Sequence, residues 1–460
     1  MRPVVLLEFN ELTPELMTRF MAEGQLPNFR RLYEQSQVFT TRARETPPAL
    51  EPWIQWVNVH TGLDYEEHRV FNLNEGHTLQ QPAIWDVLSR AGHPVLVFGS
   101  MNVRYDAGLR GCIVPDPWTT SLPPEPAELL PYFRFVQKGV ADHTSGKALS
   151  TREYLEFLGF MVRHGLSAET VGAIVRQLAI ERTGRDRWKR AVLLDKLQFD
   201  VFSWYYRRLR PHFSTFFLNS TAHFQHLYWR SFAPDLFPVK PSDEDRTEHG
   251  SAILFGYREM DRLVARFLSL AGSEAVVILC TALSQQPCVV YDDSGGKVLY
   301  RPRDFRAFLA FAGIDQKHRV SPVMAEEFHL YVEDRRELER IEALLARLTV
   351  DGRPAIRVRA REENGLLLGC GLFHEVPPDA RLQRADSAAS VPFFDLFYRI
   401  EGVKSGMHHP DGILWIRDPA RAHHVTEEKV PLTTIAPTVL DLFGVPVPEF
   451  MRGGRLKSVA

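Results

Sequence analysis

The chain opens with an apolar run, Val4-Val5-Leu6-Leu7, that leads directly into the polar cluster Glu8-Phe9-Asn10-Glu11. A short, unbroken apolar run of this kind is typical of a strand that is buried on both faces, as in a parallel sheet. Polar residues at its end then lie at the carboxyl edge of the sheet, where open α/β sheets bind ligands. The alternative is a first strand whose end is merely solvated. The opening therefore favours an α/β fold and makes Glu8 and Asn10 candidate site residues.

Strand-like and helix-like segments then alternate along the chain. This alternation predicts a mostly parallel sheet with right-handed crossovers and helices on both faces. The expected strands cover 38–41, 94–99, 214–218, 275–280 and 413–416, and the expected helices cover 14–21, 53–59, 84–91, 251–270 and 437–443.

Two segments interrupt this pattern. Residues 105–211 contain several prolines followed by long helical stretches rich in Arg, Leu and aromatic residues, which predicts an inserted helical cap. Residues 291–390 predict a small α+β insert. The α/β core is then built from 1–104, 212–290 and 391–460.

Composition excludes several classes of protein. Of the 460 residues, 45% are hydrophobic and 24% are charged, which is normal for globular proteins. The formal net charge of -2 gives no global attraction for nucleic acid, and the arginines of the helical segment are interpreted as a solvated face. No apolar stretch approaches the roughly 18 residues of a membrane span. Four cysteines without a CxxC pair favour a reducing compartment, so we expect a soluble, cytoplasmic protein, of unknown oligomeric state.

Histidines cluster at two places. His223 and His226 follow the strand at 214–218, and their spacing places both on one face of a helix. Neutral imidazole is a common zinc ligand, and three histidines can hold a catalytic metal with one open position. His223, His226 and His408 are therefore predicted to hold one divalent metal, zinc or manganese, with His409 as an alternate ligand or a substrate-binding residue. The alternative is hydrogen-bonded packing histidines.

Further polar residues stand at the starts of helices and the ends of strands. Glu51 precedes a predicted helix, where the helix dipole favours an anion, so it is a candidate general base, metal ligand or nucleophile; it could equally be an ordinary capping acid. Ser284 and Gln285 follow a buried strand and are poor metal ligands, which argues against a second metal. Gln55 and His60, on the helix after Glu51, are further substrate-binding candidates.

Four segments, in this order, resemble motifs of one family. They are Glu23-Gly24-Gln25-Leu26-Pro27-Asn28-Phe29, His60-Thr61-Gly62, Gly406-Met407-His408-His409-Pro410-Asp411-Gly412, and the closing run from Thr434 to Gly444. Together they resemble the alkaline phosphatase superfamily, and within it the type I phosphodiesterase and nucleotide pyrophosphatase branch. The resemblance implies an α/β/α sandwich.

Members of that family hold two divalent metals with Asp and His ligands, while a Ser or Thr attacks phosphorus. On this sequence the first metal Asp falls on Asn10 and the nucleophile falls on Pro52. A later Asp-x-x-x-His pair falls on Ala222 and His226, and the last metal histidine matches His408. A Ser-Asp-His-Gly strand end falls on 281–284. The resemblance therefore implies a two-metal site that is largely replaced.

Two functions follow as hypotheses. The first is a divergent hydrolase or transferase of a phosphate or related ester, with a small-molecule substrate and at most one metal. The second is a catalytically inactive phosphatase-like protein that binds a small molecule or a protein partner. The first assigns catalysis to Glu51, His226 and Asn10. In both, we expect Asn10, Glu51, His226, Gln285 and His408 to converge at one sheet edge.

Overall fold

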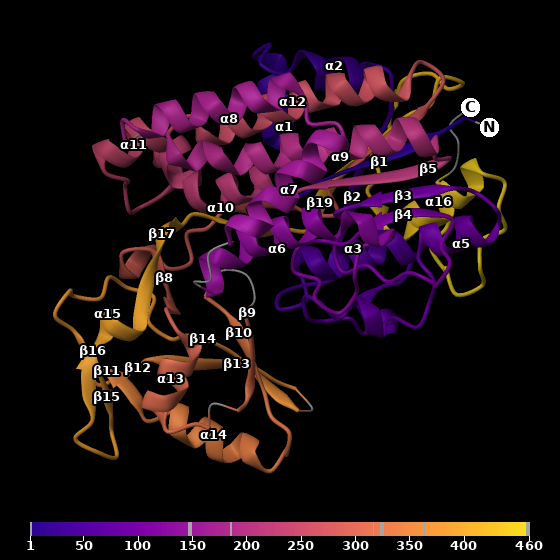
Figure 1. Ribbon diagram of the computed structural model, residues 1–460. Helices are drawn as coiled ribbons and strands as arrows, with labels where there is room; N and C mark the ends of the chain where they lie inside the picture. Colours follow the sequence, from indigo (N-terminus) through magenta and orange to yellow (C-terminus); the bar gives the residue numbers. More distant parts are fainter. Residues whose placement is uncertain are drawn as a thin grey trace.

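The computed structural model describes residues 2–145, 150–184, 186–315, 317–322, 326–362 and 364–456. Within these ranges the main sheet has nine strands in the order β20-β2-β19-β6-β1-β5-β3-β4, with β21 paired to β2 (Figure 1). β1 lies between β5 and β6 and runs parallel to both, whereas β19 runs antiparallel to β6 and β2. The predicted mostly parallel sheet is confirmed. The strands are β1 Val4–Phe9, β2 Gln37–Arg42, β3 Val95–Phe98, β4 Gly111–Val114, β5 Phe213–Leu218, β6 Val276–Cys280, β19 Asp411–Arg417, β20 His424–Val425 and β21 Val430–Pro431.

Helices cover both faces of this sheet. The side chains of β1 alternate between two hydrophobic clusters, one on each face. Val5, Leu7 and Phe9 pack in the cluster that includes α1, α2, α9 and α12. Val4 and Leu6 pack in the cluster that includes α3, α5 and α16. The result is a three-layer α/β/α sandwich. The helices are α1 Pro14–Ala22, α2 Pro27–Glu34, α9 Ala191–Leu209, α12 Ala252–Ala271, α3 Pro52–Thr61, α5 Ile84–Arg90 and α16 Ile435–Leu442.

The predicted cap at 105–211 shares elements with the core. Its first strand, β4, extends the main sheet beyond β3, and its last helix, α9, packs on the sheet together with α12. The core therefore reaches into the range predicted for the cap. The other long helices of this segment are α6 Leu130–Ser145, α7 Thr151–Arg163 and α8 Ala168–Glu181.

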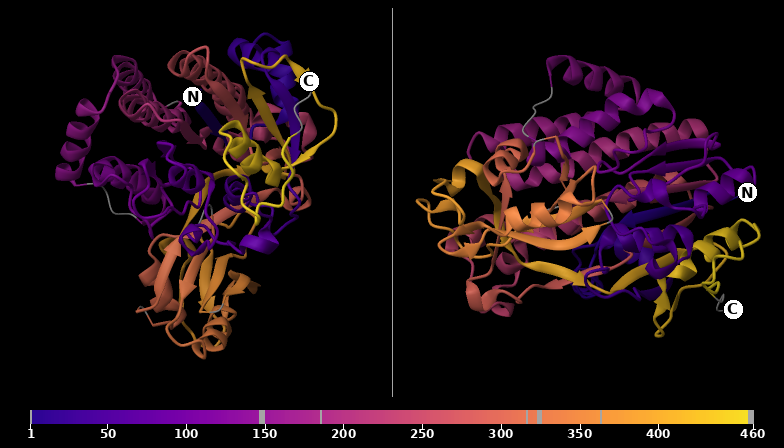
Figure 2. Two further views of the ribbon diagram at one scale, coloured as in Figure 1. Left: turned by 90° about the vertical axis from the view of Figure 1, so that its right-hand side faces the viewer. Right: turned by 90° about the horizontal axis from the view of Figure 1, so that it is seen from below.

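A second lobe has its own hydrophobic core and lies apart from the sandwich, at the end opposite the chain termini (Figures 1 and 2). Because β1 starts next to the N-terminus, its carboxyl end points toward the lobe. The lobe includes β17, which pairs with β8, so it extends past the predicted limit of 390. Its elements are β8 Lys297–Pro302, α13 Phe305–Ala312, β9 Arg319–Pro322, β10 Phe328–Tyr331, α14 Glu337–Leu345, β11 Leu348–Val350, β12 Arg353–Pro354, β13 Ile356–Glu362, β14 Gly365–Cys370, β15 Arg381–Arg384, β16 Ser390–Pro392, α15 Phe393–Leu396 and β17 Phe397–Lys404.

A two-stranded ribbon connects the lobe to the sheet edge. After β17 a single residue, Ser405, leads into β18 (Gly406–His409), which pairs antiparallel with β7 (Ser284–Pro287). This register places His408 opposite Gln285. The helix α10 (Ser220–Phe232) follows β5 and contacts both strands of the ribbon.

All four cysteines are buried and unpaired. Among the described residues, none of the helices has the length and apolar character needed to cross a membrane.

Candidate active site

The site is built around Glu11, two residues beyond the end of β1. Its backbone has φ 63°, the left-handed region that costs a residue with a side chain about 1–2 kcal/mol. Its carboxylate is buried, with 1% of the residue exposed. Such strain is concentrated at functional sites, where the surrounding structure enforces it. The backbone therefore turns an acidic side chain inward at the carboxyl edge of the sheet.

Two imidazoles face this carboxylate. Glu11 Oε2 lies 3.0 Å from His226 Nε2, on α10, and 3.7 Å from His408 Nε2, on β18. The rings of His226 and His408 meet edge to face, with centroids 5.2 Å apart. Gln285, across the ribbon from His408, donates its side-chain amide to the same carboxylate oxygen. Residues from four distant parts of the chain thus meet at one point.

The second nitrogen of each imidazole is held by the backbone. His226 Nδ1 lies 3.2 Å from the carbonyl oxygen of Gly406, and His408 Nδ1 lies 2.9 Å from that of Leu50. A carbonyl only accepts, so these contacts assign the Nδ1–H tautomer to a neutral ring. Each Nε2 then faces the Glu11 carboxylate, an arrangement that needs a proton or a cation between the nitrogen and the carboxylate oxygen. Metal-ligating histidines are commonly held in this way.

The protonation states of these groups differ. Burial alone would raise the pKa of Glu11, but the charges of His226 and His408 and the hydrogen bonds from His226 and Gln285 outweigh it and lower this pKa to about 2. Burial lowers the pKa of His408 to about 4, although Glu11 acts in the opposite direction. At neutral pH the cluster therefore holds an ionised carboxylate and a neutral imidazole, the forms in which these groups bind metals.

A layer of amides fixes Glu11 from behind. Asn10 Nδ2 donates to Glu11 Oε1 at 2.7 Å and to Asn219 Oδ1 at 2.8 Å, and Asn10 Oδ1 accepts from Trp56 Nε1 at 2.9 Å. Gln225 Nε2 donates to the Glu11 carbonyl oxygen at 2.7 Å. With both ends of its amide engaged, Asn10 positions the carboxylate and is not itself placed to carry out chemistry.

Glu51 lies on the other side of His408. Its Oε2 is 3.4 Å from His408 Nδ1, and 30% of the side chain is exposed. Burial, together with the negative charges of Glu327 and Glu11, raises the pKa of Glu51 to about 8, while Lys404 and Arg359 of the lobe oppose the shift. Glu51 is therefore mostly protonated at neutral pH. That state suits a proton donor better than the predicted base or nucleophile.

The structure brings together the five residues expected at the edge: Asn10, Glu51, His226, Gln285 and His408 are linked through contacts with Glu11 and with each other.

His223 does not join His226 and His408; it is exposed, one turn earlier on α10. At 3.6 residues per turn, positions three apart differ by about 60° in direction, which is enough to turn His223 to solvent. The third group is Glu11: its carboxylate and the two imidazoles have ligand atoms within 4.8 Å of one another.

Several predicted substrate-binding residues are enclosed. Glu8 and His60 form a buried pair with Glu8 Oε1 2.9 Å from His60 Nε2. Gln55 is fully buried and donates to the Ala49 carbonyl oxygen at 3.0 Å. Glu8, Gln55 and His60 therefore have almost no surface to offer a ligand. Gln55 and His60 lie on α3, which packs in the same hydrophobic cluster as α16. Ser284 is also buried, and His409 is half-buried and accepts from the Asp411 amide at 3.2 Å.

The donor set of Glu11, His226 and His408 fits one divalent cation. One carboxylate and two imidazoles are a known catalytic zinc set that leaves a position open. The two Nε2 atoms that face the Glu11 carboxylate, each with its Nδ1 held by a backbone carbonyl, are the structural observation that supports this fit. No sequence signal selects Glu11, because the left-handed backbone that turns its side chain inward has no signature in a non-glycine residue.

Comparisons with known proteins find structural similarity only. No family model and no curated protein sequence matches the chain. Murine ectonucleotide pyrophosphatase/phosphodiesterase 5 is 12% identical, with TM-score 0.45, over 97% of this chain and 96% of that one. The human protein of that name is 10% identical with TM-score 0.44, over 97% and 96%. Phosphonoacetate hydrolase from Sinorhizobium meliloti 1021 is 13% identical with TM-score 0.41, over 95% and 96%.

One of the murine structures holds AMP.

Proposed function

We propose that the cluster of Glu11, His226 and His408 is the active site of a divergent hydrolase or transferase that acts on a phosphate or related ester with one divalent cation. The observation that carries the proposal is the meeting of an ionised carboxylate with two imidazoles whose Nδ1 atoms are tied to the backbone. The family resemblance of the sequence motifs supports the ester as substrate class.

Glu11, His226 and His408 would hold the cation. When bound, it would polarise the ester oxygen and stabilise negative charge as it develops. Gln285 and Asn10 keep the Glu11 carboxylate in place through their amides. The surrounding structure enforces the left-handed backbone at Glu11, which suits a site that must hold its geometry before substrate arrives.

Glu51 would supply the proton. Burial raises its pKa to about 8 in the metal-free chain, so its acid form is available at neutral pH to protonate the leaving-group oxygen as the ester bond breaks. Glu11 and Glu51 thus differ in protonation although both are partly or fully enclosed acids, so that one can hold the cation and the other can give a proton. Water or an acceptor alcohol is the attacking group, since the nucleophile position of the resemblance is Pro52.

The rival proposal is a protein that binds a ligand and does not turn it over. Pro52 is the observation that favours it, because proline carries no nucleophilic group. A screen of phosphodiesters, phosphomonoesters, sulfate esters and nucleotide sugars with added zinc and manganese separates the two. Turnover that is lost in Glu11→Gln and His226→Ala but kept in His223→Ala supports the enzyme. Binding without turnover in the whole screen supports the rival.

A cytoplasmic location also remains a proposal. The four unpaired cysteines support a reducing compartment.

A further inference from the structure

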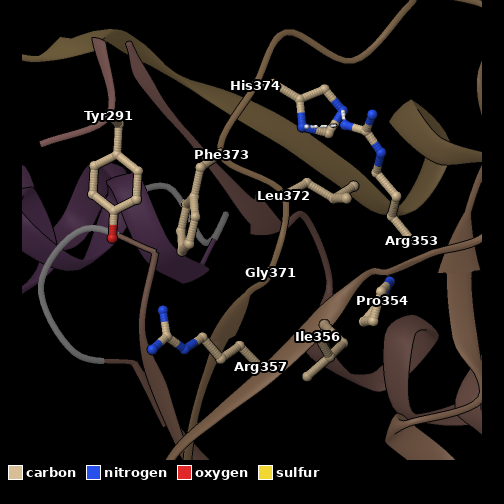
Figure 3. A pocket seen from close by; sticks show the side chains of 9 residues that line it. All are labelled: Tyr291, Arg353, Pro354, Ile356, Arg357, Gly371, Leu372, Phe373 and His374. Atoms are coloured by element: carbon tan, nitrogen blue, oxygen red, sulfur yellow. Dashed lines mark hydrogen bonds between the residues drawn. The ribbon is translucent and has the colours of Figure 1, made fainter. Parts of the chain in front are cut away.

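A cavity of about 810 Å³ lies away from the Glu11 cluster, between the loop that follows β7 and the strands β12 and β13 of the lobe (Figure 3). Its volume falls within the range of about 300–1,000 Å³ that is usual for sites of small organic ligands. Its lining is divided into an apolar part and a cationic part, which restricts the chemistry of a ligand.

The apolar part is an aromatic wall that is held in position. The rings of Tyr291 and Phe373 have centroids 5.3 Å apart and are inclined by 51°. The ammonium group of Lys297 lies 4.5 Å from the centroid of Phe373 and 5.5 Å from that of Tyr291. Lys297 is itself held by Glu326 at 3.0 Å. Ile356 and Leu372 continue the apolar surface from this wall toward Arg353 (Figure 3).

The cationic part is the guanidinium group of Arg357, on β13, which extends into the cavity below Phe373 (Figure 3). Arg353, on β12, lies on the opposite side of the cavity, where its Nη1 is 3.2 Å from His374 Nε2 (Figure 3). None of the nine residues that line the cavity is acidic. A guanidinium group without an acidic neighbour in the lining favours an anion, and its planar shape matches carboxylate, phosphate and sulfonate groups.

We propose that this cavity binds a small organic anion with a flat apolar body and one acidic head group. The body packs on Phe373 and Tyr291, where an aromatic ring gains from offset or edge contacts as well as from burial. The head group lies beside Arg357, below the aromatic wall (Figure 3). The site is separate from the Glu11 cluster and does not depend on the function proposed for that cluster.

Calorimetric titration of the full-length protein with naphthalene-1-sulfonate and 1-naphthoate tests the proposal. Both should bind at one site per chain. Two probes isolate the parts of the ligand: 1-naphthalenemethanol keeps the rings without the charge, and methanesulfonate keeps the charge without the rings. Each should bind at least about tenfold more weakly, since a charge-assisted hydrogen bond or a buried ring contributes that much.

Variants assign the binding to this cavity. Arg357→Gln should weaken both naphthyl anions about tenfold or more, and Phe373→Leu should weaken them while keeping the charge selectivity. Arg399→Gln is the matched control, because Arg399 is a lobe arginine that pairs with Glu375 at 3.3 Å and does not line the cavity. Thermal melting of every variant shows that it is folded. Failure of both anions to bind, equal affinity for the neutral alcohol, or equal weakening by Arg399→Gln would overturn the proposal.

Discussion

Replacing Glu51 by Gln removes an acidic proton from the proposed site and keeps the shape of the side chain. With its pKa at about 8, Glu51 is roughly 90% protonated at pH 7, whereas at the ordinary value of 4.5 it would be protonated in about 0.3% of molecules. Burial thus makes the acid about 300-fold more available at neutral pH. A positioned general acid contributes about 10²–10⁴-fold in rate. We expect Glu51→Gln to lower turnover by that factor where the leaving group needs a proton.

The dependence on the leaving group makes this prediction specific. A 4-nitrophenolate group departs readily as an anion, so the variant should turn over 4-nitrophenyl esters within about tenfold of the wild type. For alkyl esters of the same acid, whose leaving groups need a proton, the loss of turnover in Glu51→Gln should rise toward about 10²–10⁴-fold. Steady-state rates of both proteins on a series of esters with leaving groups of increasing basicity provide the measurement. A wild-type to variant ratio that stays constant across the series would refute the role of Glu51 as a proton donor.

Three further predictions concern packing and pH. A Cβ at position 406 would lie 2.1 Å from Gln285 Oε1, so Gly406→Ala should displace the ribbon and weaken metal binding. Gly172→Ala is the control and should not weaken it, because no atom lies within 4 Å of the added carbon. Titration of both variants with metal decides this. Arg230→Met leaves the buried Asp292 without its bidentate partner at 2.8 Å, so it should lower the free energy of unfolding in denaturant by about 3–5 kcal/mol. Arg152→Met, which breaks the exposed pair Arg152–Glu156, is the control and should leave that free energy unchanged. As the pH rises from about 4.5 to about 8, Glu51 keeps its proton in the folded chain after the unfolded chain has lost it. The free energy of unfolding of the wild type should therefore fall relative to that of Glu51→Gln over this pH range. Denaturant unfolding of both proteins that shows a constant difference across this range would contradict the raised pKa.

The sequence predicted the parts of the fold that depend on local pattern. The apolar run of β1, the proline that starts α1 and the glycine that ends α3 are local signals, and the elements lie where these signals placed them. The meeting of Asn10, Gln285 and His408 at one edge was expected from the family resemblance, which implies a shared sheet edge for these segments.

What the sequence could not predict depends on backbone geometry and on pairing between distant segments. The inward direction of Glu11 comes from its left-handed φ, and the position of His408 comes from the pairing of β18 with β7. His223 lies about 60° around α10 from His226, and the packing of that helix decides which of the two faces the site. The strand β17 gave no local signal that it belongs to the lobe, because its partner β8 lies about a hundred residues earlier.

The metal content of the purified protein tests the central claim most directly. Protein prepared without chelator, equilibrated with a small excess of zinc and freed of unbound metal should hold one ion per chain by elemental analysis. Glu11→Gln and His408→Ala should each lose most of it, since either change removes one of three ligands. His223→Ala should keep the full amount. A wild-type chain that binds no ion or two, or an ion that survives Glu11→Gln and is lost in His223→Ala, would contradict the site built on Glu11, His226 and His408.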